Sequence, residues 1–446
     1  MPEQRQGADG RPGRAAASPG QQAKSVSPAR WATFRVLMEV GSTSAHSDDL
    51  LHGAELRKLS QADRNLATAL VMGVLRWQIA LDAELAKLLA RPEQPLPLEV
   101  RVALRMGAFQ LRHMDRVPPH AALSESVELA RAAGHPKAAG LVNAVLRKLV
   151  ATKAPGKPIV ESVDAMATRL GHPAWMVRRW EGFYGREAAM AICGYDQHEP
   201  ARGDLFLPNE AAEHVDVNLI DDGSRLIAEL AAASHRSPQR IWDACAAPGG
   251  KTAVLARRHP AAEVLATDVS GRRLQSMERR LEHEMPGRKI RTLQVDAAEL
   301  PAREGRFDLI LCDVPCSGTG TLARNPEIRH RLEANEFERQ AVRQRRILSE
   351  ALKRLNPGGC LLYSTCSLEH EENEAVVNAV LGESDTRQRL RMVSIGDLLQ
   401  RLRSDGIVRQ DASDLTQLAP KDTLRTLPGA NFQGDGFFAA VFAREV

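Results

Sequence analysis

The sequence lacks several patterns that commonly define the class of a protein. Its six cysteines include no C-x2-C pair, and this spacing argues against a zinc site. No apolar run approaches the roughly 18 residues of a membrane span, so we predict no contact with a membrane. Residues 1–27 are rich in Gly, Pro, Gln, Arg and Ala, without the apolar core of a signal peptide, and we interpret them as a disordered tail. Together these absences predict a cytoplasmic protein with reduced thiols.

Aromatic residues and net charge are also low. Aromatic side chains make up 4% of the chain, while 43% hydrophobic residues suffice for packed cores. Lysine and arginine (60) nearly balance aspartate and glutamate (56), which gives a net charge of +4. Residues 101–150 hold eight basic and three acidic residues, a composition that fits either a nucleic acid partner or a solvated helix face. A length of 446 residues predicts two or three domains, at about 100–200 residues each.

One turn of small residues stands between a predicted strand at 240–244 and a predicted helix that opens at Thr252. It reads Cys245-Ala246-Ala247-Pro248-Gly249-Gly250-Lys251. The pattern is neither the GxGxxG dinucleotide fingerprint nor the GxxxxGK[ST] phosphate loop. Turns of this kind in open α/β sheets bind ligands, because backbone N–H groups are free there and glycine permits close approach. The turn alone therefore predicts a ligand site of unspecified chemistry.

Polar side chains follow four further predicted strands. These strands are 263–268, 290–295, 307–312 and 360–365, and their polar ends are Asp268, Asp296, Asp313 and Cys366-Ser367. We predict helices at 271–284, 338–355 and 369–381, of which the second is basic and a candidate nucleic-acid-facing element, and a final strand at 437–443. Alternation of strand and helix indicates a parallel sheet with helices on both faces. All these polar residues should then lie along the carboxyl edge of one sheet.

Two of the six cysteines stand apart from the others. Cys316 and Cys366 each follow an apolar strand within a polar turn of small residues, where a thiol can be exposed and reactive. Cys193, Cys312 and Cys360 lie within apolar stretches, and we interpret them as small buried hydrophobic residues. Two thiols at neighbouring strand ends suit a reaction that needs a nucleophile and a second proton-transfer group.

Three motifs carry a resemblance to a known family. The sequences CAAPGGKT (245–252), DVPCSGTG (313–320) and YSTCS (363–367) occur in this order. They resemble the S-adenosylmethionine-dependent RNA cytosine-C5 methyltransferases of the Sun/RsmB type. The resemblance implies that Cys366 adds to cytosine C6, that Cys316 assists its release and that Asp313 hydrogen-bonds the cytosine edge. It also implies an S-adenosylmethionine pocket lined by Cys245, Ala246, Ala247, Pro248, Gly249, Gly250, Lys251, Asp268, Asp296 and Asp313, with Asp268 at the ribose and Asp296 near the adenine.

The resemblance also implies a domain order. We expect a tail at 1–27, an all-α NusB-like RNA-binding bundle at 28–152, linker helices with a shortened RNA-guiding segment at 153–221, and a Rossmann-like methyltransferase domain with a mostly parallel seven-stranded sheet at 222–446. Only 23 residues lie between Glu199 and Asp221 inclusive, too few for the small RRM-like subdomain of relatives. Candidate phosphate contacts in the bundle are Arg105, Arg112, Arg116, Arg147 and Lys148.

The expected partner is RNA, most specifically small-subunit (16S) ribosomal RNA, because the NusB-like domain marks that branch of the family. Two alternatives stay open: a transfer RNA cytosine-C5 methyltransferase, and a catalytically weak RNA-binding or ribosome-assembly factor. An amino-N methyltransferase would need an Asn/Asp-Pro-Pro-Tyr turn after the fourth strand, and residues 313–316 read Asp-Val-Pro-Cys. We expect a monomer without a metal.

Overall fold

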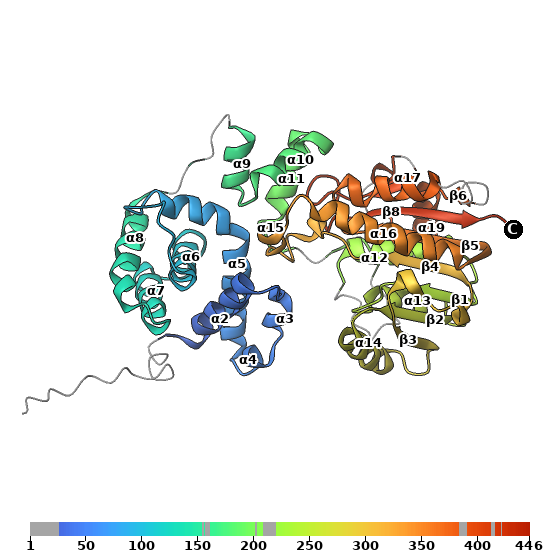
Figure 1. Ribbon diagram of the computed structural model, residues 1–446, viewed down its shortest axis with the longest axis horizontal. Coiled ribbons are helices and arrows are strands. Elements are labelled where there is room, and N and C mark those ends of the chain that lie inside the picture. The colour runs from blue at the N-terminus through green and yellow to red at the C-terminus, as the bar shows by residue number, and fades with distance from the viewer. Residues whose placement is uncertain are drawn as a thin grey trace, which may run out of the picture. The chain divides into compact units, whose positions relative to one another are not determined.

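The computed structural model describes residues 26–153, 156, 161–200, 203–207, 220–382, 390–411, 415–420 and 422–446 (Figure 1). These residues form two compact units, which divide between residues 159 and 160. Nearly all of the predicted tail (1–27) lies outside the described residues. Most of the predicted short guiding segment (199–221) lies outside them as well.

Unit 1 is helical throughout its described residues. Its helices are α2 (Pro28–Ser42), α3 (Ser47–Leu51), α4 (Ala54–Arg57), α5 (Gln61–Ala86), α6 (Leu98–His113), α7 (Pro119–Ala132), the 3-10 turn η2 (Pro136–Ala138) and α8 (Ala139–Ala151). Proline occupies the first turn of α2 and of α7, where its missing N–H costs no hydrogen bond. Helix α5 begins after Ser60, whose side chain accepts a hydrogen bond from the backbone N–H of Asp63.

The core of unit 1 is built around α5. Its side chains Leu70, Val74 and Leu81 are almost fully buried. At Gly73 an added Cβ would lie 1.9 Å from the Phe109 ring of α6, so glycine is required for the close approach of these two helices. Helix α5 is long and apolar enough to cross a membrane by length and composition only, a test that a buried core helix also passes.

Two arginines of α6 contradict the prediction that they are free to contact phosphate. Arg105 is buried and forms a bidentate ion pair with Asp82 of α5, with Nε–Oδ1 and Nη2–Oδ2 distances of 2.7 and 2.6 Å. Arg112 pairs in the same way with Glu84. A buried guanidinium needs such a partner, and the partners come from the neighbouring helix. By contrast, Arg116, Arg147 and Lys148 are exposed, and their phosphate contacts stay a prediction.

Unit 2 contains a mostly parallel sheet. Its strands are β1 (Arg240–Asp243), β2 (Glu263–Asp268), β3 (Ile290–Gln294), β4 (Phe307–Asp313), β5 (Leu355–Thr365), β6 (Leu390–Met392), β7 (Thr423–Arg425) and β8 (Phe438–Arg444). The order is β3-β2-β1-β4-β5-β8-β6, in which the first five strands are parallel and β8 is antiparallel to β5. The sheet therefore has eight strands instead of the predicted seven. The extra strand is β7, which pairs with β8 on the same side as β6. With three residues it is too short to leave a pattern in the sequence.

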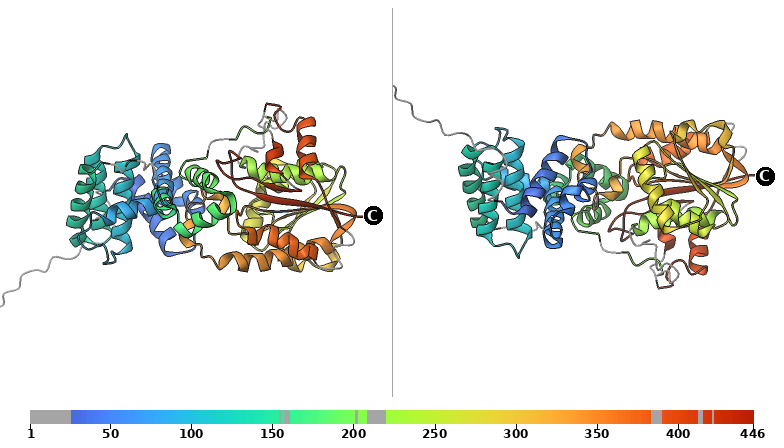
Figure 2. Two further views of the ribbon diagram at one scale, coloured as in Figure 1. Left: turned by 90° about the horizontal axis from the view of Figure 1, so that it is seen from above. Right: turned by 90° about the horizontal axis from the view of Figure 1, so that it is seen from below.

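Helices cover both faces of this sheet (Figure 2). The helices of unit 2 are α9 (Val163–Arg169), α10 (Ala174–Tyr184), α11 (Arg186–Tyr195), α12 (Asp222–Ser234), α13 (Gly250–Arg258), α14 (Gly271–Glu284), α15 (Ile328–Arg331), α16 (Glu336–Lys353), α17 (Glu374–Gly382) and α19 (Ile395–Ser404). Its 3-10 turns are η4 (Ala297–Glu299), η5 (Ala302–Glu304), η6 (Thr319–Thr321), η7 (His370–Glu372) and η8 (Leu415–Leu418). One face packs against α12, α13, α14 and α19, and the other against α16 and α17. Neighbouring strand residues alternate between the two cores, as Ile241 and Trp242 do.

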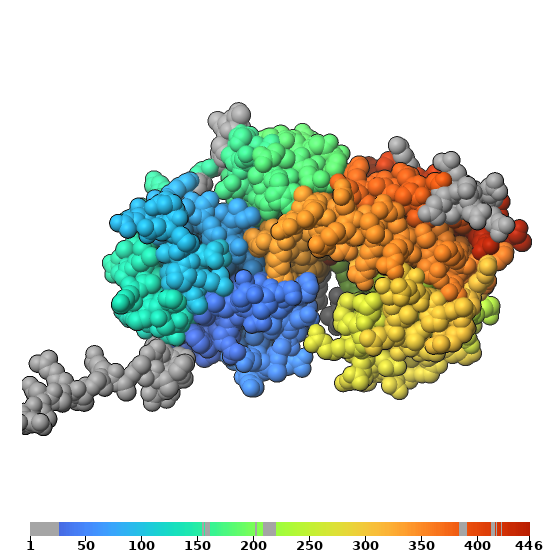
Figure 3. Space-filling view, in the orientation of Figure 1, coloured from blue at the N-terminus to red at the C-terminus, as the bar shows by residue number. Residues whose placement is uncertain are grey.

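Helix α16 lies on the face of unit 2 seen in Figure 3. Its exposed side chains include Arg339, Val342 and Arg346. Arg339 pairs with Glu336, and Arg346 Nη2 lies 3.0 Å from Glu299 Oε1, so acidic neighbours offset part of the positive charge of this helix. A role of α16 in RNA contact stays a prediction.

Candidate functional site at the carboxyl edge of the sheet

The turn between β1 and α13 folds against the end of β2. The Ala246 N–H donates to the Thr267 carbonyl at 2.8 Å, and the Ala247 N–H donates to Asp268 Oδ2 at 3.3 Å. Gly249 has a φ of +94°, and an added Cβ there would lie 2.5 Å from Met277 Cγ. Glycine is therefore required both by the backbone conformation and by the space. The structure thus brings the small-residue turn and Asp268 together, as the sequence predicted from strand order.

Asp268 and Asp296, at the ends of β2 and β3, accept different hydrogen bonds. Asp268 is only 6% exposed and also accepts from the Ser270 N–H at 2.8 Å, while Arg273 Nη1 lies 3.7 Å from its carboxylate. Asp296 follows β3, one strand further out, and caps η4 by accepting from the Ala298 N–H at 3.0 Å. Asp268, the last residue of β2, is therefore hydrogen-bonded to the turn, whereas Asp296 lies at the end of the adjacent strand β3.

Asp243, the last residue of β1, was missed by the sequence reasoning. Its side chain is buried, and its Oδ2 accepts from Thr252 Oγ1 at 2.6 Å. The other oxygen, Oδ1, has no hydrogen-bond partner within the part of the chain that the structure describes. Burial raises the pKa of Asp243 to about 7. An acid at a strand end directly before the turn was the signal that could have identified it.

An ion pair connects the turn to the end of β4. Lys251 Nζ lies 2.7 Å from Asp313 Oδ2, and Ser364 Oγ of β5 donates to Asp313 Oδ1 at 2.8 Å. Burial by itself lowers the pKa of Lys251, but the charge and hydrogen bond of Asp313 outweigh it and leave the pKa raised. The ammonium group also lies 5.3 Å from the centre of the Phe437 ring. Lys251 is therefore a charged member of this edge and not a surface lysine.

The two predicted reactive thiols meet at the ends of β4 and β5. Cys316 Sγ and Cys366 Sγ are 3.2 Å apart, and both residues are partly buried. The hydrogen bond with Cys366 and burial both raise the pKa of Cys316 well above that of an ordinary thiol. Cys193, Cys312 and Cys360 are buried, as predicted for small hydrophobic residues.

A buried carboxylate joins the two cysteine turns. Glu372 accepts hydrogen bonds from the Ser317 N–H at 2.9 Å and from Gln344 Nε2 at 3.0 Å, and also from the hydroxyls of Ser317 and Ser367. Ser317 follows Cys316 and Ser367 follows Cys366, so one side chain contacts both turns. Burial raises the pKa of Glu372, against the opposing effect of these donors. The sequence reasoning missed Glu372, because a glutamate in a charged stretch indicates a solvent-exposed helix.

Comparison with known proteins assigns both parts of the chain. The family described as 16S rRNA methyltransferase RsmB/F matches residues 231–443, and the NusB family matches residues 27–151. A Xanthomonas campestris protein named ribosomal RNA small subunit methyltransferase B is 33% identical over 359 residues, covering 72% of this chain and 79% of the relative. A Bacillus subtilis protein named "Probable ribosomal RNA small subunit methyltransferase B" is 31% identical over 398 residues, with coverage of 78% and 87%.

A solved structure supports the fold. The structure titled "Crystal Structure of PH0851" superposes with a TM-score of 0.68 at 19% identity and covers 94% of this chain and 99% of its own. At this identity the likeness concerns the fold alone. The relatives and the two matching families confirm the resemblance that the three motifs indicated. The chain therefore belongs to the family of ribosomal RNA small subunit methyltransferase B, with a NusB-family domain followed by an RsmB/F methyltransferase domain.

Proposed function

We propose that this protein methylates C5 of a cytosine in small-subunit ribosomal RNA, using S-adenosylmethionine and a covalent bond between Cys366 and C6 of the base. The observation that carries the proposal is the 3.2 Å separation of the Cys316 and Cys366 sulfur atoms at the carboxyl edge of the sheet. The Lys251–Asp313 ion pair lies at the same edge and connects the β1–α13 turn to β4, where Cys316 follows. The names of the relatives support the choice of ribosomal RNA.

The proposed cofactor site is the turn from Cys245 to Lys251 with Asp268, Asp296 and Asp313. The chemistry of the residues fits the group: a glycine turn that permits close approach, a carboxylate at Asp268 for a ribose hydroxyl pair, and a buried Asp243 oxygen without a partner in the described chain. S-adenosylmethionine supplies, when bound, the electrophilic methyl group that cytosine C5 receives. The residues of the chain hold the two reactants in contact and exclude water.

Cys366 acts as the nucleophile in this proposal. Its thiolate adds to C6, and the electron pair of the C5–C6 double bond makes C5 nucleophilic. The Cys316 sulfur lies 3.2 Å from the attacking sulfur, so the second thiol stands beside the bond that forms. Asp313 accepts from the cytosine N4 amino group with the lone pairs that Lys251 and Ser364 leave free.

Cys316 completes the reaction. Cys316 gives its thiol proton to solvent water, and the resulting thiolate takes the proton from C5, whose electron pair restores the C5–C6 double bond as the Cys366 thiolate leaves. The two thiols therefore have different tasks.

Substitution of the two thiols tests the proposal. With target RNA, Cys316→Ala should accumulate a protein–RNA adduct on denaturing gels, because attack and methylation proceed while release fails. Cys366→Ala should form no adduct and transfer no methyl group. Cys360→Ala, in the middle of β5, is the matched control and should behave as the wild type. An adduct formed by Cys366→Ala and absent from Cys316→Ala would reverse the assignment, and mass-spectrometric mapping of methylcytosine distinguishes ribosomal from transfer RNA.

A further inference from the structure

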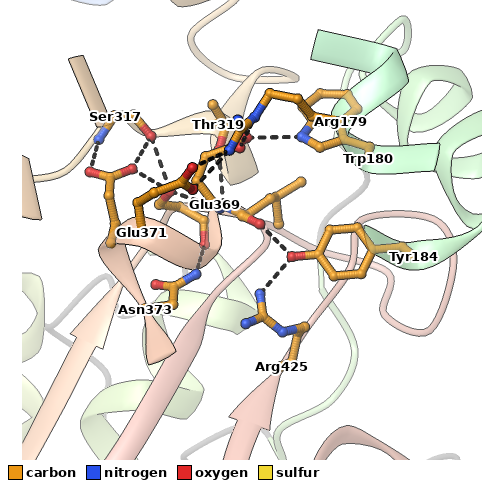
Figure 4. Close-up of polar contacts among 12 residues, drawn as sticks. Arg179, Trp180, Tyr184, Ser317, Thr319, Glu369, Glu371, Asn373 and Arg425 are labelled. Carbon is orange, nitrogen blue, oxygen red and sulfur yellow. Dashed lines mark hydrogen bonds and ion pairs between the residues drawn. The ribbon is translucent and has the colours of Figure 1, made fainter. Parts of the chain in front are cut away.

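Residues 367–373, between Cys366 and α17, form a loop that is held from both sides. On the inner side, Glu372 binds the two cysteine turns, and Asn373 Nδ2 donates to the Ser367 carbonyl at 2.8 Å. On the outer side the loop contacts α10, which belongs to the helical segment 161–197 (Figure 4). This segment lies between the residues matched by the two families, which end at 151 and begin again at 231. Its task in the protein is therefore open.

The main contact between α10 and the loop is made by Glu369. Its side chain is fully buried, with an exposed fraction of 0%. Trp180 Nε1 donates to Oε1 at 3.0 Å, and Arg179 Nε donates to Oε2 at 2.8 Å. Burial raises the pKa of Glu369, while Arg179 acts in the opposite direction. Both oxygens of a buried carboxylate three residues from Cys366 are therefore satisfied by two consecutive residues of α10.

Neighbouring residues of the loop are also attached to α10. Arg179 Nη2 donates to both carboxylate oxygens of Glu371, at 2.9 and 2.8 Å. The Tyr184 hydroxyl donates to the Leu368 carbonyl and accepts from Arg425 Nη1 at 2.8 Å. The Leu368 side chain lies in an apolar cluster of this segment, together with Met176, Val177 and Trp180. Residues 368, 369 and 371 thus all depend on α10 for their position.

The loop can keep Glu369 buried only while α10 supplies hydrogen bonds to its carboxylate. A buried carboxylate that loses its partners costs several kcal/mol, so the loop would have to move to return Glu369 to water. Such a movement begins three residues from the nucleophile, and a misplacement of about 1 Å can reduce a rate by about 100-fold. Upstream, Cys366 follows strand β5, which is fixed by the sheet. The downstream side is therefore the one that needs a second support.

We propose that Arg179 and Trp180 are positioning residues that hold the Cys366 turn in its reactive geometry, and that segment 161–197 is part of the catalytic apparatus. The inference rests on the proposed role of Cys366. A phosphate contact by Arg179 is the competing interpretation. It is disfavoured because this guanidinium already binds carboxylate oxygens of Glu369 and Glu371 and lies over the rings of Phe183 and Phe337, at 5.1 and 4.8 Å.

Variants on α10 separate these interpretations. Arg179→Met removes the ionic contacts and keeps the length of the side chain, and Trp180→Phe removes the N–H donor. The matched control is Arg178→Met on the same helix, because among the described residues Arg178 pairs with Asp164 alone, in an exposed ion pair with exposed fractions of 54% and 60%. For each full-length variant we would measure kcat and KM for ribosomal RNA, the Kd for S-adenosylmethionine, and the rate of adduct formation in the Cys316→Ala background.

For Arg179→Met we expect kcat and the rate of adduct formation to fall by about 10–100-fold, with KM and cofactor Kd within about twofold of the wild type. Trp180→Phe should show a smaller fall of the same kind, and Arg178→Met none. A rise in the KM for RNA with kcat unchanged would assign Arg179 to phosphate binding and overturn the inference. Arg179→Lys, which keeps the charge and loses the forked contacts, should recover only part of kcat.

A measurement without RNA keeps the inference separate from the proposed function. Iodoacetamide labels thiols, and peptide mass spectrometry gives the labelling rate of Cys366. Displacement of the loop in Arg179→Met should change this rate by at least about threefold, whereas Arg178→Met should leave it unchanged. Equal labelling and equal kcat in Arg179→Met would overturn the inference. Absence of cytosine methylation by the wild type would overturn the proposed function, while a changed labelling rate would still support the positioning of Cys366 by α10.

Discussion

Replacement of Glu372 tests whether one buried carboxylate holds the two cysteine turns together. Glu372→Ala removes the acceptor of four donors: the Ser317 N–H and hydroxyl, the Ser367 hydroxyl and Gln344 Nε2. The two hydroxyls are 3.0 Å apart and can bond to each other, and Gln344 Nε2 keeps its 2.9 Å contact with the Pro315 carbonyl. The Ser317 N–H and one hydroxyl then stay buried without a partner.

The expected magnitude follows from these contacts. Each unsatisfied buried donor costs about 1–3 kcal/mol, so with the cavity left by the side chain we expect Glu372→Ala to lower the free energy of unfolding by about 3–5 kcal/mol. Glu372→Gln is the matched control. Its amide oxygen can replace Oε1, and its NH2 group can donate to the two hydroxyls, which rotate to accept. One hydroxyl proton is left without an acceptor, because only one hydroxyl can donate to the other, so we expect a loss of about 1–3 kcal/mol, smaller than that of Glu372→Ala.

Chemical denaturation and methyl transfer measure the two effects. We expect kcat to fall by about 100-fold in Glu372→Ala because both thiols lose their alignment, and to stay within about tenfold of the wild type in Glu372→Gln. Binding of S-adenosylmethionine should be nearly unchanged in both variants, since Glu372 contacts the cysteine turns and not the β1–α13 turn. Equal losses in the two variants would show that the negative charge and not the hydrogen-bond geometry of Glu372 is required, and would refute the argument.

Three further predictions concern the cofactor edge and unit 1. Asp268→Ala should weaken S-adenosylmethionine in calorimetric titration, and no binding by the folded wild type would contradict the proposed function. The raised pKa of Asp243 stabilises the fold fully below its ordinary value of 3.8, and this contribution is lost as the pH rises to about 7. Denaturation of wild type and Asp243→Asn should therefore show the wild type losing relative stability over this window, by at most about 1.4 kcal/mol per pH unit. Arg105→Ala should lower the stability by about 2 kcal/mol through loss of its Asp82 contacts, whereas exposed Arg116→Ala should have little effect in the same assay.

The site could be predicted from the sequence where strand order alone decides proximity. Parallel strands end at one edge, so residues that follow β1, β4 and β5 must lie near one another. This places Lys251, Asp313, Cys316 and Cys366 in one region, and the structure shows the first two in an ion pair and the last two in sulfur–sulfur contact. The glycines of the turn and the buried cysteines follow from similar local reasoning.

The burial of charged residues was harder to predict from the sequence, because it depends on partners far along the chain. Glu369 binds Arg179, 190 residues away, and nothing near either residue in the sequence indicates the contact. Arg105 has a basic context that predicts exposure, yet Asp82 on the adjacent helix permits its burial. A lone charge is expected at the surface because burial without a partner is costly. The partner is known only once the helices are packed, so sequence reasoning missed Glu369 and Glu372 but predicted that the two thiols and the Lys251–Asp313 pair lie at one edge.

The position of β8 determines when the sheet of unit 2 can be completed during translation. This strand, Phe438–Arg444, pairs with β5 on one side and with β6 and β7 on the other, so it joins the catalytic sheet to its remaining strands. Until the ribosome has released it, β5 presents an apolar edge with unpaired backbone groups, the kind of edge on which chains aggregate. The edge of β5, the strand that Cys366 follows, is therefore paired only after β8 has been translated. We expect truncation before Phe438 to leave this edge exposed and to favour aggregation.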